Sequence, residues 1–166
     1  VSYAMELGFD AEDISFTGHA VSNADLDVLA QHPAVHVNCD ALSTIRRLGE
    51  RCPGRPIGIR VNPRVGAGYN DRLHYAGPRP SKFGIYRDRF DEALELAARY
   101  AMKVTQVHFH FGYGYLTHDL PQFEEALANA CGFIDRCPDV DTLDIGGGMG
   151  APVTSGHPPL DLGRWA

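Results

Sequence analysis

Lysine is scarce in this chain of 166 residues, because only Lys82 and Lys103 among the 15 basic residues are lysines and the others are arginines. Chemistry that needs a lysine therefore has two candidates here. Long apolar runs are also missing, and none approaches the roughly 18 residues of a membrane-spanning helix. The basic residues are outnumbered by 21 acidic ones and form no stripe. We therefore expect neither a membrane segment nor a nucleic-acid partner.

Cysteine is sparse too, and the four cysteines contain no C-x-x-C pair. The chain shows no secretory signal peptide, so we expect reduced thiols and a cytoplasmic location. Its composition, 44% hydrophobic and 22% charged residues, is typical of one globular domain. The chain begins at Val1 without methionine and ends at Ala166 within a helix-like segment. We therefore expect a piece of a longer protein.

Short apolar segments typical of strands alternate with amphipathic segments typical of helices. Strands are expected over residues 14–18, 35–39, 57–62, 104–111 and 142–145, and helices over residues 22–31, 43–51, 88–100 and 121–134. This alternation indicates a parallel sheet covered by helices. Residues 62–85, with Tyr69, Asn70, His74 and Tyr75, are expected to form a long loop. Loops of this length are usually functional or disordered.

Two α/β folds compete for this pattern, an open doubly wound sheet and a (β/α)₈ barrel. A dinucleotide-binding sheet needs its glycine motif after the first strand, whereas the glycine cluster here follows the last one. Polar residues end nearly every expected strand, as at Asn38, Arg60, Asn62 and His110. A barrel builds its active site on that face. We therefore favour a partial barrel of about five consecutive βα units, whose remaining strands lie outside this chain.

Two histidines, His108 and His110, stand two residues apart on an expected strand and so share one face. With His118 and Asp119 they could form a metal site, as in a metal-dependent barrel hydrolase. A single H-x-H pair is weak evidence for a metal. We favour one core histidine and one site residue, with no metal.

Three consecutive glycines, Gly146, Gly147 and Gly148, end the last expected strand. Without side chains, the backbone can approach an anion closely and direct its N–H groups toward it. Late strands of barrels commonly hold phosphate at this end. The glycine turn therefore predicts a phosphate site.

Together these segments resemble the barrel domain of the fold-type III pyridoxal-phosphate decarboxylases, the family of the diaminopimelate, ornithine and arginine decarboxylases. This barrel is of the alanine-racemase-like type, and the resemblance is greatest to the diaminopimelate decarboxylase branch. It rests on IGIRVNP at 57–63, YAG at 75–77, SKFGI at 81–85, HFHFG at 108–112 and LDIGGG at 143–148, with a fainter match at 37–40.

The resemblance implies pyridoxal 5′-phosphate as cofactor and assigns roles at matching positions. His110 matches the histidine that stacks on the pyridine ring, and Gly146, Gly147 and Gly148 match the turn that binds the phosphate. Arg60 matches an arginine at the rim of the active site. The resemblance also covers three further positions. Tyr113 replaces a phosphate-binding serine, Lys82 matches a lysine at the dimer contact, and Asn38 lies where relatives carry a polar or acidic residue beneath the site.

Several family features are absent from these residues. Neither lysine matches the family's cofactor-binding lysine, and the late E-P-G-R motif and the C-terminal β-domain do not occur. Residues 1–166 are therefore expected to form the central part of the barrel domain, without the first strands and the last strand. This part contains no catalytic residue of its own and is expected to be inactive alone.

The resemblance implies that the parent protein is a homodimeric carboxy-lyase acting on a small amino acid. Its favoured reaction converts meso-diaminopimelate to L-lysine and CO₂ in lysine biosynthesis. One alternative is an ornithine- or arginine-type decarboxylase. Another is a non-catalytic regulator that occupies a partner's dimer interface, which the departures at Ala41, Thr44 and Tyr113 favour. The retained His110 and glycine turn favour the enzyme.

Overall fold

A curved, parallel sheet forms the body of the computed structural model, which describes residues 1–68, 76–77 and 79–166. Its strands, all parallel to their neighbours, follow the chain in the order β1 (Ser15–Gly18), β2 (His36–Cys39), β3 (Ile57–Arg60), β5 (Val104–His108) and β7 (Thr142–Asp144). The Ser15 hydroxyl on β1 donates to the Asp144 carboxylate on β7 at 3.4 Å. The sheet therefore curls until side chains of its outermost strands meet across the concave side, and the expected partial barrel is confirmed.

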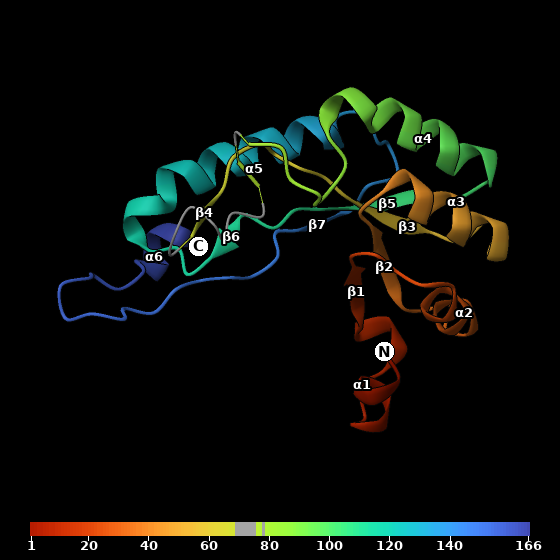
Figure 1. Ribbon diagram of the computed structural model, residues 1–166, viewed down its shortest axis with the longest axis horizontal. Coiled ribbons are helices and arrows are strands. Elements are labelled where there is room, and N and C mark those ends of the chain that lie inside the picture. Colours follow the sequence, from red (N-terminus) through yellow and green to blue (C-terminus); the bar gives the residue numbers. More distant parts are fainter. Residues whose placement is uncertain (69–75, 78) are drawn as a thin grey trace.

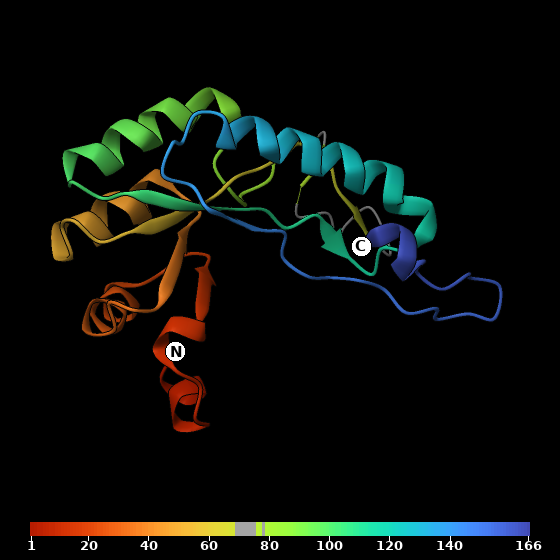
Figure 2. The ribbon, with the colours of Figure 1, turned by 180° about the vertical axis from the view of Figure 1, so that it is seen from behind.

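Helices cover the convex side of this sheet (Figures 1 and 2). They are α2 (Asn23–Gln31), α3 (Leu42–Arg51), α4 (Phe90–Arg99) and α5 (Leu120–Ile134), with 3₁₀ turns η2 (Arg87–Arg89) and η3 (Thr117–Asp119) before the last two. Ser22 caps α2, because its hydroxyl accepts the Asp25 N–H and the Asp25 carboxylate accepts the Ser22 N–H. Two short helices, α1 (Ser2–Glu6) and α6 (Leu162–Trp165), and the 3₁₀ turn η1 (Ala11–Asp13) lie near the ends of the chain.

The two faces of the sheet differ in polarity because side chains alternate along each strand. On the convex side, strand residues such as Val37, Ile59 and Val107 are buried against the helices. Polar residues occupy the alternate positions and line the concave side, among them Asn38 and Gln106, which share a hydrogen bond. The hydrophobic core therefore lies between sheet and helices, whereas the barrel interior is polar.

The largest departures from the expected boundaries concern the strand over 104–111 and the long loop. The strand expected over 104–111 ends at His108, and Gly112–Tyr113 form a separate strand, β6. This strand pairs in parallel with β4 (Ala67–Gly68), which lies inside the expected loop. A Cβ on Gly112 would overlap the Ala67 carbonyl oxygen, so the close approach of the two backbones needs glycine there. Tyr69, Asn70, His74 and Tyr75 lie outside the described residues.

The described ends of the same loop are held by the Asn62 side chain. Its amide donates to the Phe83 carbonyl at 2.7 Å and to the Ser81 hydroxyl at 3.1 Å, and its oxygen accepts the Arg64 N–H at 2.9 Å. The segment carrying Ser81 and Phe83 is therefore fixed against the end of β3.

A buried arginine, Arg55, connects α2 to the sheet. Its guanidinium donates to the carbonyl oxygens of Leu29 at 2.5 Å, Val35 at 2.6 Å and His32 at 3.1 Å. These carbonyls belong to the last turn of α2 and to the connection that leads into β2. Arg55 therefore closes the carboxyl end of this helix.

The end of the chain returns to the beginning of α5 after an extended excursion, drawn in blue in Figure 1. The Trp165 indole N–H donates to the Tyr115 hydroxyl at 3.2 Å, and Arg164 pairs with Glu124 at 3.0 Å. All four cysteines are free thiols. Within the described ranges, every helix is too short or too polar to cross a membrane.

Candidate functional site

The predicted site residues come together at the carboxyl ends of three neighbouring strands. Arg60 ends β3, His110 follows β5 by two residues, and the glycine turn follows β7. A Cβ on Gly146 would lie 2.9 Å from the His110 Nδ1, and a Cβ on Gly148 would lie 3.3 Å from the His110 Cε1. His110 is therefore packed directly against the glycine turn.

The glycine turn is shaped by close contacts on both flanks. Gly146 and Gly148 have φ angles of +69° and +95°, which side-chain-bearing residues rarely adopt. A Cβ on Gly148 would overlap the Gly112 carbonyl oxygen, and the Gly148 carbonyl accepts the Gly114 N–H at 2.7 Å. By contrast, a Cβ on Gly147 would meet nothing within 4 Å. The turn is thus fixed at its two ends and open at its centre.

The backbone donors of the turn are used unequally. The Gly146 N–H donates to Asp144 Oδ1 at 2.9 Å. The N–H groups of Gly147 and Gly148 donate to no group in the part of the chain that the structure describes. Two backbone donors beside open space at a strand end fit an anion such as a phosphate.

His110 is half-buried and electrostatically disfavoured as a cation. Burial lowers the pKa of its imidazole below 6.5, and the charges of Arg60 and His108 lower it further, while Asp144 acts in the opposite direction. At neutral pH His110 is therefore a neutral imidazole, which can pack flat against an aromatic cofactor.

This lowered pKa predicts how the stability of the protein depends on pH. Because the unfolded chain binds the proton more readily than the folded one, His110 should lower the free energy of unfolding as the pH falls through 6.5, until the folded-state pKa is passed. Urea unfolding between about pH 5 and pH 8 measures this. His110→Asn should flatten that part of the curve. Identical curves for His110→Asn and the unchanged protein would contradict the argument.

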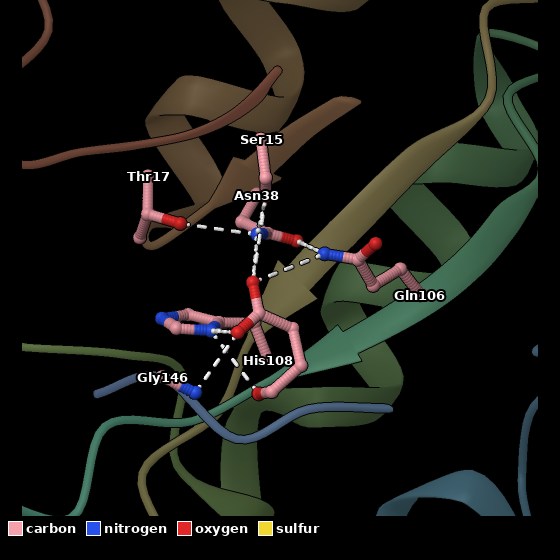
Figure 3. A network of polar contacts seen from close by, with 7 residues as sticks. Ser15, Thr17, Asn38, Gln106, His108 and Gly146 are labelled. Atoms are coloured by element: carbon pink, nitrogen blue, oxygen red, sulfur yellow. Dashed lines mark hydrogen bonds and ion pairs between the residues drawn. The ribbon is translucent and has the colours of Figure 1, made fainter. Parts of the chain in front are cut away.

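Beneath the site, the concave side of the sheet carries a polar network (Figure 3). The Asn38 amide nitrogen donates to Thr17 at 3.0 Å, to Ser15 at 3.2 Å and to the Asp144 carboxylate at 3.3 Å, and its oxygen accepts from Gln106 at 2.9 Å. The structure therefore places Asn38 under the site, as the resemblance implies. Asp144 is not among the site residues predicted from the sequence, although a polar residue inside an apolar strand is a usable signal.

His108 joins this network rather than a metal site. Its Nδ1 lies 3.0 Å from the Asp144 carboxylate and 3.1 Å from the Asp144 carbonyl oxygen. His118 lies on η3, exposed, with its Nε2 3.4 Å from Asp119. Among the described residues, no three potential ligands from His, Cys, Asp and Glu are grouped around a metal position.

Tyr113 and Lys82 lie at the edge of the site. Tyr113 is on β6, next to the Gly114 N–H that holds the glycine turn, and 54% of its surface is exposed. Lys82 is exposed, and its Nζ lies 5.2 Å from the centre of the Phe83 ring. The Arg60 guanidinium contacts the same ring at 4.9 Å.

A second histidine–carboxylate pair, which sequence reasoning missed, completes this rim. His19 Nδ1 lies 3.0 Å from the buried Asp40 carboxylate, and the His19 ring packs against Phe83 with 5.1 Å between ring centres. His19 and Asp40 follow β1 and β2 directly, so polar groups line the carboxyl ends of these strands as well.

Comparison with known proteins shows which enzymes this chain resembles. The chain is 33% identical to a diaminopimelate decarboxylase of Methanothermobacter thermautotrophicus over 98% of its length, and 28% identical to one of Streptomyces coelicolor over 96%. It spans 39% and 35% of these relatives, so it corresponds to less than half of each.

Solved structures agree in fold. A crystal structure of diaminopimelate decarboxylase superimposes with a TM-score of 0.84 at 25% identity, over 99% of this chain and 39% of that one. Lysine decarboxylase from Selenomonas ruminantium gives a TM-score of 0.77 at 24% identity, over 98% of this chain and 41% of that one, which shows the fold alone.

The decisive match is to a family model described as "Pyridoxal-dependent decarboxylase, pyridoxal binding domain", which extends over residues 1–166. The cofactor of this family is pyridoxal phosphate, and the Gly147 and Gly148 amides, which bond to no described group, and the neutral His110 fit its phosphate and its ring. The chain therefore belongs to the pyridoxal-binding domain of the pyridoxal-dependent decarboxylases.

Proposed function

We propose that residues 1–166 form the central part of the barrel domain of a decarboxylase that converts meso-diaminopimelate to L-lysine and CO₂. The observation that carries the proposal is the convergence of Arg60, His110 and the glycine turn at adjacent strand ends. The choice of substrate is supported by the 33% identity to a relative named diaminopimelate decarboxylase. Sequence similarity of this kind covers nearly the whole chain.

Each site residue would bind or orient the cofactor. The pyridine ring of bound pyridoxal phosphate supplies an electron sink for the bond that breaks. The neutral His110 imidazole would hold the plane of that ring, and the Gly147 and Gly148 amides would bind the phosphate without any change of protonation. Arg60 would add positive charge at the rim, and the Tyr113 hydroxyl would replace a serine as a further phosphate donor.

The lysine that attaches the cofactor is proposed to come from another segment of the protein. Lys82 is exposed in the loop before α4, and Lys103 precedes β5 at the opposite end of the strands from His110. Residues 1–166 alone should therefore release no CO₂. The parent protein is proposed to be a cytoplasmic homodimer, with Lys82 at the contact between subunits.

The substrate is tested on the full-length protein that carries this chain. Purified with pyridoxal phosphate, it should release CO₂ from meso-diaminopimelate with a kcat/KM at least about 100-fold above that for L-ornithine, L-arginine or L-lysine. Captured CO₂ and chromatography of the amino-acid product measure this, and residues 1–166 alone provide the control. A preference for ornithine or arginine would reject the proposed substrate and retain the family.

A regulator without activity is the second candidate, favoured by Tyr113 at a position where the family resemblance implies a serine. In that case the full-length protein would bind no pyridoxal phosphate. Absorbance of the bound cofactor therefore separates the two candidates before any assay of activity.

A further inference from the structure

We propose that Asp144 is a positioning residue that sets the glycine turn for phosphate binding. Its carboxylate accepts a hydrogen bond from the Gly146 N–H and so directs that N–H toward the barrel interior. The amides of Gly147 and Gly148 then remain available to donate to the phosphate. This inference rests on the proposed function, because it concerns the same cofactor site.

The contacts of the carboxylate carry this inference. Five donors surround it from four different strands or their ends (Figure 3). Oδ1 faces the Gly146 N–H at 2.9 Å and His108 Nδ1 at 3.0 Å. Oδ2 faces Asn38 at 3.3 Å, Ser15 at 3.4 Å and Gln106 at 3.5 Å. Such a set of donors holds the carboxylate, and with it the first amide of the turn, in one position.

The surrounding donors stabilise the negative charge of Asp144. A carboxylate close to a phosphate site repels the phosphate unless its charge is compensated. Burial alone would raise the pKa of Asp144, yet the hydrogen bonds and charge of His108, with those from the Gly146 N–H and Ser15, lower it. The hydrogen bonds of this network therefore stabilise an ionised carboxylate next to the turn.

Position along the chain connects this carboxylate to the turn. Asp144 ends β7 and Gly146 follows two residues later with a φ of +69°. Since the Gly146 N–H is already bonded inward, the donors next in line are those of Gly147 and Gly148. A Cβ on Gly147 would meet only open space, so the phosphate can approach there.

Variants of the full-length protein test the inference through affinity, without an activity assay. Asp144→Ala and Asp144→Asn should weaken binding of pyridoxal 5′-phosphate by about 10- to 100-fold. Binding of pyridoxal, which lacks the phosphate, should change by less than about twofold, because attachment and ring stacking are common to both ligands. Asp141→Asn is the matched control, since Asp141 is an exposed carboxylate just before β7 and should change neither affinity.

A measurement on the unaltered protein covers the case in which the Asp144 variants do not fold. With ¹⁵N-glycine labelling, titration with inorganic phosphate should move the amide protons of Gly147 and Gly148 downfield and leave that of Gly146 in place. A shift confined to Gly146 would overturn the inference, and so would an Asp144→Ala protein that keeps the unaltered affinity for pyridoxal phosphate. If the unaltered protein binds neither ligand, the proposed function fails as well.

Discussion

Gly148→Ala is expected to lower the free energy of unfolding by about 4 kcal/mol, because two penalties add at one position. The φ of +95° disfavours any residue with a Cβ, and the new methyl group would overlap the Gly112 carbonyl oxygen. That oxygen belongs to the backbone of β6, which also pairs with β4 and cannot move independently. Urea unfolding of the full-length protein measures the change.

Gly147→Ala is the matched control, and it should separate stability from binding. Its Cβ meets nothing within 4 Å, so the free energy of unfolding should change by less than about 1 kcal/mol. The same methyl group would occupy the space proposed for the phosphate, and affinity for pyridoxal phosphate should fall at least about tenfold. Equal destabilisation by the two substitutions would show that the turn is not fixed at Gly148.

Arg55→Met is expected to destabilise the protein by about 3 kcal/mol, since three backbone carbonyls lose a charged donor at once. Methionine keeps much of the volume and the aliphatic packing of the arginine but donates no hydrogen bond. The effect should be concentrated at the carboxyl end of α2. Hydrogen exchange of the amides in α2 and in the connection to β2 should therefore accelerate in the variant.

Arg136→Met provides the comparison for this prediction. Arg136 is an exposed partner of Asp91 on the surface of α4, and 46% of its side chain is accessible. Exposed ion pairs contribute about 0–1 kcal/mol, so this substitution should have a small effect. If both arginine variants lower the free energy of unfolding by the same amount, the carbonyl contacts of Arg55 are not what stabilises this region.

Most of the fold could be predicted because each strand and helix has its own pattern of apolar residues in the local sequence. Alternating apolar residues locate β2 and β3, and the Ser22 cap and the amphipathic pattern locate α2. The end of β5 could not be predicted in this way. Phe109 and Phe111 continue the apolar pattern, but the backbone leaves the sheet after His108 so that Gly112–Tyr113 can pair with β4, a contact between distant segments.

The candidate site shows the same division. Motifs identified Arg60, His110 and the glycine turn, and the structure brings them together. The separate roles of Gly146, Gly147 and Gly148 could not be predicted, because the three residues are identical in sequence. Each role depends on what lies opposite: His110 at Gly146, open space at Gly147 and the β6 backbone at Gly148. The Asp144 network stayed hidden because its donors come from strands far apart in the chain.

The hydrogen bond between Ser15 and Asp144 also bears on how this domain folds. The two residues are separated by 129 positions, whereas each strand pairs with a neighbour much closer in sequence. Closing so long a segment costs chain entropy that is recovered only after the intervening strands have assembled. We therefore expect the Asp144 carboxylate to remain hydrated until late in folding. The polar network beneath the cofactor site is then among the last parts of the barrel to lose its water during folding.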